Sequence, residues 1–150
     1  MRTVTMSFIF NQVKTLLIKK RLNLESDRIC AVLLNGYFTP DKDNKFLSEI
    51  PKINISSEPV ELRNKSFENY VFDADDISFP CVCGNNITGI LIYQDCKKHH
   101  LIGFIDKAFS LPVIPNGGNI DVTWDNGARK ILEMKGDFID LKDGIGGVEV

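Results

Sequence analysis

The chain of 150 residues has the length of one compact domain, which buries roughly two thirds of the surface that its unfolded chain exposes. Hydrophobic residues make up 43% of it, a content that excludes wholesale disorder. The formal net charge is -2, so there is no overall excess of positive charge for binding nucleic acid. A basic cluster at residues 14–21 is explained by a solvated helix face.

The first segment with a clear periodicity lies near the N-terminus. Between Phe8 and Arg21 the apolar side chains recur at helical spacing, and Ser7 is placed to act as the N-cap. We therefore expect one amphipathic helix over about residues 7–21, docked on the domain or on a neighbouring subunit. Polar residues interrupt the first 17 positions and no small-residue cleavage site follows, so we expect neither a signal peptide nor a membrane span.

From Arg28 onward, short apolar or alternating runs separated by turn residues replace the helical spacing. The expected strands are residues 29–34, 53–56, 60–66, 71–73, 77–79, 87–95, 101–106, 120–124 and 129–134. One helical turn is expected at residues 46–50, ended by Pro51. Residues 87–95 and 101–106 should pair as a hairpin, and the Asn126-Gly127 step predicts a second hairpin between the last two strands.

This pattern predicts a mostly β fold, an antiparallel sandwich, jelly roll or barrel with one N-terminal helix. Residues 1–134 are expected to form a single β-rich domain. Residues 135–150 alternate acids, lysines and glycines, and we interpret them as a C-terminal arm or tail, with one added strand around residues 138–141 as the alternative. The predicted core consists of Val32, Leu34, Phe72, Ile90, Ile92, Ile102, Phe104, Val122 and Trp124.

Four cysteines are too few and too unevenly spaced for a disulfide scaffold. Cys30 lies in an apolar run, where a free cysteine behaves as a small hydrophobe. Cys81, Cys83, Cys96 and His99 are candidate zinc ligands, but their spacing departs from the C-x2-C knuckles of common zinc modules. We expect no metal, no cofactor and reduced thiols; a disulfide from Cys96 to Cys81 or to Cys83 is the remaining alternative.

Three acidic residues, Asp73, Asp75 and Asp76, are close in sequence but do not follow the calcium-loop pattern. Caps on turns at a sheet corner explain them better. The sequence lacks the common catalytic signatures, and only Cys96 with His99 suggests a nucleophile and its base. We expect a protein that is not an enzyme.

Several of these segments, taken in order, resemble a family of small structural proteins from tailed-bacteriophage particles. The segments are NLESDRICAVLLNGYFTPDKD at 23–43, YVFDADDISFP at 70–80, TGILIYQD at 88–95, LIGFID at 101–106 and IDVTWDNGARKIL at 120–132. The resemblance covers about residues 8–132. It fails at residues 54–61, which read NISSEPVE where the family carries a glycine-rich segment.

The resemblance implies a non-enzymatic virion component, made in the host bacterial cytoplasm. The leading expectation is a capsid auxiliary or decoration (cement) protein that binds the assembled shell. The alternatives are a neck, tail or fibre-anchoring component and, from another class, a host-directed binding module or small enzyme. The implied partners are other virion proteins, the major capsid protein first, and further copies of the chain; neither nucleic acid nor a membrane is expected.

Overall fold

The computed structural model describes residues 8–36, 38–68, 71–106, 111–124, 131–135, 138–140 and 145–149. Its elements in chain order are β1 (Phe8–Ile9), α1 (Gln12–Ile18), β2 (Ile29–Asn35), η1 (Leu47–Glu49), η2 (Lys52–Asn54), β3 (Val60–Glu61), β4 (Ser66–Glu68), β5 (Val71–Asp73), β6 (Ile77–Phe79), β7 (Ile87–Gln94), β8 (Leu101–Ile105), β9 (Ile120–Trp124), β10 (Leu132–Lys135), β11 (Phe138–Asp140) and β12 (Ile145–Glu149).

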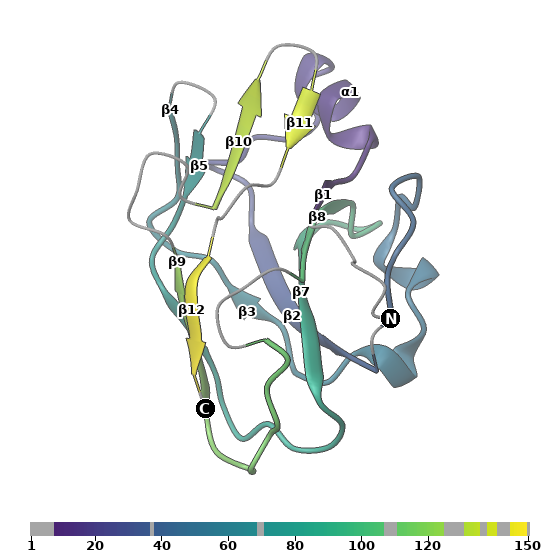
Figure 1. Cartoon of the computed structure of the whole chain (residues 1–150). Helices are drawn as coiled ribbons and strands as arrows, with labels where there is room; N and C mark the ends of the chain where they lie inside the picture. The colour runs from purple at the N-terminus through teal and green to yellow at the C-terminus, as the bar shows by residue number, and fades with distance from the viewer. Residues whose placement is uncertain are drawn as a thin grey trace.

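The strands form three antiparallel sheets, which confirms the mostly β prediction (Figure 1). The largest sheet has the order β1-β8-β7-β2-β3, and the smaller ones have the orders β11-β10-β5-β4 and β12-β9-β6. Within the described part of the chain, no helix is long and apolar enough to cross a membrane. The finer assignment to a sandwich or jelly roll stays a prediction.

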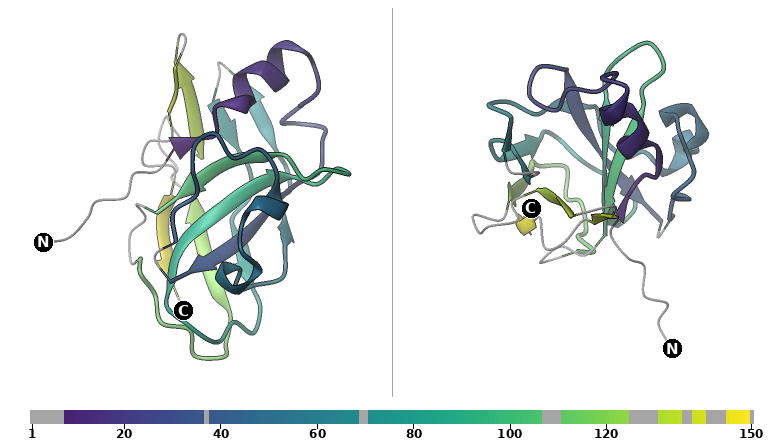
Figure 2. Two further views of the ribbon diagram at one scale, coloured as in Figure 1. Left: turned by 90° about the vertical axis from the view of Figure 1, so that its right-hand side faces the viewer. Right: turned by 90° about the horizontal axis from the view of Figure 1, so that it is seen from above.

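The five-stranded sheet lies in the middle of the molecule. The two smaller sheets lie against one of its faces, while α1, η1 and η2 lie on the other side (Figures 1 and 2). Every residue of β2, β7 and β8 is consequently buried, whereas β9 alternates buried and exposed positions. Coverage of both faces explains why the central strands are continuous apolar runs in the sequence.

The predicted core is confirmed. All nine expected residues are buried, and Trp124 and Phe104 are each 1% exposed. The hairpin of β7 and β8 is also confirmed, with Leu91 opposite Phe104.

The N-terminal helix is shorter than predicted, since α1 spans Gln12–Ile18 rather than residues 7–21. Phe8 and Ile9 instead form β1 and pair with Phe104 and Gly103 of β8. Their side chains are buried, so they fit the apolar spacing of a helix although the backbone is extended. Asn11 occupies the N-cap position, and Ser7 lies outside the described residues.

The segment at residues 53–66 also differs from the prediction. Residues 53–56 contribute a 3-10 turn and an isolated bridge from Ile55 to Leu34 rather than a strand. Ser57 Oγ accepts the Leu33 N–H at 3.0 Å, and the Ser56 N–H donates to the Leu33 carbonyl at 2.8 Å. The hydrogen bonds of Ser56 and Ser57 with Leu33 therefore attach this segment to β2. The single strand expected at 60–66 is two short strands, β3 and β4.

The predicted hairpin between residues 120–124 and 129–134 is wrong. β9 pairs with β6 and β12, and β10 pairs with β5 and β11, so the two strands belong to different sheets. Residues 125–130, including the Asn-Gly step, lie outside the described part. The segment interpreted as an arm or tail supplies two strands: β11 pairs with β10, and β12 pairs with β9 (Figure 1).

Candidate functional site

A buried amide, Gln94, organises the polar groups at the end of β7. Its side-chain Nε2 donates to Asp27 Oδ2 at 2.7 Å and to the Arg21 carbonyl at 3.1 Å. Its Oε1 lies 2.8 Å from His100 Nδ1. An amide oxygen can only accept, so Nδ1 carries the imidazole proton in this arrangement. One side chain thus joins the segment after α1, the central sheet and the β7–β8 turn.

Cys96 lies beside this network but lacks a base. Its Sγ is 3.7 Å from His100 Nδ1 and 3.6 Å from Gln94 Oε1. Because Nδ1 is engaged as a donor to Gln94, it has no lone pair with which to accept the thiol proton. Burial lowers the pKa of His100, and the charges of Lys98 and Arg21 lower it further, which favours the neutral ring.

The predicted partner of Cys96, His99, points elsewhere. Its Nε2 lies 3.1 Å from Asp95 Oδ1, and Asp95 Oδ2 lies 2.8 Å from Arg28 Nε. The Arg28 side chain is 60% exposed, so this ion pair contributes little to stability. His99 adopts a left-handed conformation with φ 51° and its N–H donates to the Cys96 carbonyl at 3.1 Å. These contacts shape a tight turn and leave Cys96 and His99 apart.

The candidate zinc ligands do not meet. Cys81 and Cys83 lie in the loop before β7, while Cys96 and His99 lie in the turn after it. Eight residues of strand separate the two pairs, a length of about 23 Å at roughly 3.3 Å per residue. Among the described residues no group of three or more His, Cys, Asp or Glu side chains is arranged to hold a metal ion. The same separation contradicts a disulfide from Cys96 to Cys81 or Cys83, and all four cysteines are free.

The acidic corner at residues 73–76 is tied to β9. Asp76 Oδ1 accepts the Trp124 N–H at 2.9 Å, and the indole Nε1 donates to the Asp75 carbonyl at 2.8 Å. The Asn64 side-chain amide donates to the Asp75 carboxylate. The carboxylates therefore bond to amides, as expected for turn caps, but the cap of Asp76 reaches a strand 48 residues away. No sequence signal indicated that distant partner.

A shallow hollow of about 540 Å³ lies between α1 and the loop that joins β2 to η1, and the sequence did not indicate it. Asn11 Nδ2 donates to Asp43 Oδ1 at 2.7 Å, and Gln12 Nε2 donates to the Lys45 carbonyl at 2.7 Å. The lining residues are Asn11, Gln12, Thr15, Leu16, Asp43 and Lys45. Their amide and carboxylate groups are used to attach the loop to the helix.

The polar groups of the described residues thus serve mainly to connect elements. Every buried side-chain nitrogen or oxygen among them has a hydrogen-bond partner. A satisfied network of this kind fixes a unique arrangement of the elements that it joins. Comparisons with protein-family models, with curated proteins and with solved structures found no match to this chain.

Proposed function

We propose that the chain is a non-enzymatic structural component of a tailed-bacteriophage particle, and that it binds the assembled shell as a capsid auxiliary or decoration protein. The ordered set of segments that resembles such proteins supports this. One observation carries it further: Asp76 and Trp124, from two segments of that set, bond to each other at one corner. Residues that carry the resemblance thus make contacts within the chain, and we expect partners to contact other residues at the surface.

Such a protein would stabilise the particle by linkage. A ligand that binds only the assembled shell shifts the equilibrium towards assembly, by about 2.7 kcal/mol per site when its free concentration is 100 times the dissociation constant. No turnover is required for this effect. The arrangement around Cys96 agrees with this, because His100 Nδ1 donates to Gln94 rather than accepting the thiol proton.

The test is the number of copies per particle, measured by quantitative mass spectrometry of purified virions against the major coat protein. Hundreds of copies would support a shell component. About a dozen would instead assign the protein to a cyclic neck or tail assembly. A non-structural phage protein of similar abundance in the lysate serves as the control for carry-over. Absence from washed particles would refute the proposal.

A further inference from the structure

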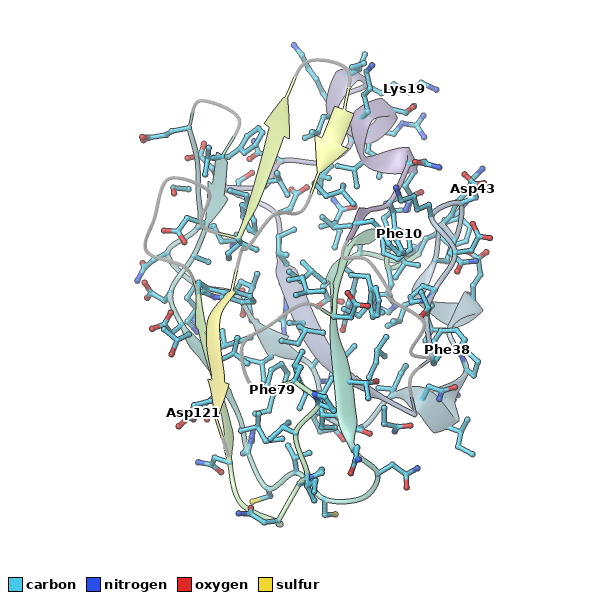
Figure 3. The ribbon with its side chains drawn as sticks, in the orientation of Figure 1. Phe10, Lys19, Phe38, Asp43, Phe79 and Asp121 are labelled. Atoms are coloured by element: carbon cyan, nitrogen blue, oxygen red, sulfur yellow. The ribbon has the colours of Figure 1, made fainter. Side chains whose placement is uncertain are left out.

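Two cationic segments that are far apart in the sequence meet at one corner of the molecule. Lys19, Lys20 and Arg21 follow α1, and Lys97 and Lys98 form the turn between β7 and β8. Gln94 joins the two segments, since its side chain bonds to the Arg21 carbonyl and to the His100 ring. The turn and the segment after α1 lie on the same side of the molecule in Figure 2, and Figure 3 shows Lys19 at the outer surface.

Among the described residues, no carboxylate forms an ion pair with the positive charges at this corner. All five side chains are exposed, and none of them forms an ion pair with another residue in the part of the chain that is described. The nearby carboxylates have other partners: Asp27 accepts from Gln94, and Asp95 contacts Arg28 and His99. Like charges repel one another, so these five cations do not attract each other in the folded protein, whereas an acidic partner would attract all of them.

An exposed apolar side chain adjoins these cations. Ile18, the last residue of α1, is 69% exposed, whereas Val13 and Leu16 of the same helix are buried. An apolar anchor within a polar, charged rim is the usual anatomy of a protein–protein contact. Nucleic-acid contacts are instead dominated by phosphate and base-edge hydrogen bonds, which an isoleucine cannot make.

We propose that the patch formed by Ile18, Lys19, Lys20, Arg21, Lys97 and Lys98 docks on an acidic protein surface that offers an apolar socket for Ile18. The inference rests on the proposed function, in which that surface belongs to another protein of the particle. Opposite charges steer the two surfaces together and select against basic partners, while burial of Ile18 supplies attraction that salt does not screen.

The test compares two charge-reversed variants in particles assembled without the wild-type protein. Lys19→Glu/Lys97→Glu alters the patch but spares Lys20, whose φ is 58°, and Lys98, which lies over the Phe46 ring. Lys52→Glu/Lys65→Glu makes the same change of charge elsewhere. We expect the patch variant to lose at least about tenfold in copies per particle, and the control variant to keep the wild-type number. Ile18→Ser should also lower the copy number.

An unchanged melting temperature establishes that each variant folds. If Lys19→Glu/Lys97→Glu does not fold, Lys97→Glu alone takes its place. Wild-type copy number for a folded patch variant overturns the inference and leaves the proposed function standing. Absence of the wild-type protein from particles overturns both. If the wild-type protein forms an oligomer in sedimentation and the patch variant does not, the patch serves self-association. If the wild-type protein binds duplex DNA and only the patch variant loses that binding, the patch serves nucleic acid. Either result overturns the proposal of an acidic protein partner.

Discussion

A glycine in the central sheet provides the sharpest test of the packing. Gly89 is buried in β7, and a Cβ added to it would lie 2.6 Å from Cε1 and 3.0 Å from Cζ of Phe104. Ordinary carbon–carbon contacts lie at about 3.5–4.0 Å, so the ring would have to move. Phe104 is 1% exposed, and its ring centroid lies 5.6 Å from that of Phe8, which limits such movement.

We expect Gly89→Ala to destabilise the protein. Overpacking costs about 1–3 kcal/mol. Gly89 does not have a positive φ, so alanine can adopt its backbone conformation. Alanine also lowers the conformational entropy of the unfolded chain, which offsets about 0.4–1 kcal/mol of the overpacking cost. The net loss should be about 1–2 kcal/mol, or a melting temperature lowered by roughly 2–8 °C at about 2–4 °C per kcal/mol.

A double-mutant cycle measured by denaturant unfolding separates the steric cause from a general effect of the substitution. Phe104→Leu alone removes packing and costs part of the roughly 3–5 kcal/mol expected for truncation to alanine. It also clears the space that the new methyl group needs, so the double variant should be more stable than the sum of the single effects by about 1–2 kcal/mol. Strict additivity, or a Gly89→Ala variant as stable as the wild type, would refute the reasoning.

Four further outcomes are expected. Asp76→Ala should cost about 1–3 kcal/mol by leaving the Trp124 N–H unpaired, while Asp76→Asn keeps an acceptor and should recover most of the loss in denaturant unfolding. Because the pKa of His100 is lowered in the fold, the unfolded chain takes up the proton first as the pH falls. The stability that neutral His100 contributes is therefore fully present above about pH 6.5 and declines as the pH falls below that value. Thermal melts from pH 5 to 8 should show a decline that His100→Gln reduces, and an identical pH dependence in that variant would contradict the sign. Chelator should leave the melting temperature unchanged, with elemental analysis finding far less than one zinc per chain, since β7 separates the candidate ligands. Ending the chain at residue 144 removes β12 and frees one edge of β9, so we expect a lower unfolding midpoint and association in gel filtration, whereas an unchanged midpoint would mean that β12 is dispensable to the fold.

The elements that the sequence predicted well are those whose burial is uniform. β7 and β8 are continuous apolar runs because both faces are covered. β5 and β6 are buried less evenly, and they were predicted because acidic residues and Pro80 mark their ends. The start of α1 was misplaced because buried positions in strands and in helices are occupied by the same apolar residue types. Local spacing cannot tell Phe8 in β1 from a residue on a helix stripe.

The pairing of distant strands was beyond the reach of local pattern. An Asn-Gly step flanked by strand residues predicted a hairpin at 126–127, but β9 and β10 join different sheets. The contacts that decide this are long range, among them the bond from Asp76 to the Trp124 N–H. The candidate zinc ligands were grouped for a similar reason, because they are close in the sequence. In the structure they lie at opposite ends of β7. The Gln94 network was missed because Arg21 and Asp27, the two partners of its Nε2, lie 73 and 67 residues away in the sequence.

The geometry of the largest sheet limits how the protein can bind a partner. Both faces are covered, and its two edge strands, β1 and β3, have only two residues each. So short an edge gives an added strand few backbone hydrogen bonds, which makes pairing with a partner's strand a weak mode of recognition here. A partner that contacts this sheet would therefore be recognised largely by side chains at strand ends and turns, which is where the cations of the proposed patch around Ile18 lie. Recognition by charge and one apolar anchor predicts binding that weakens with salt yet depends on Ile18 at every salt concentration.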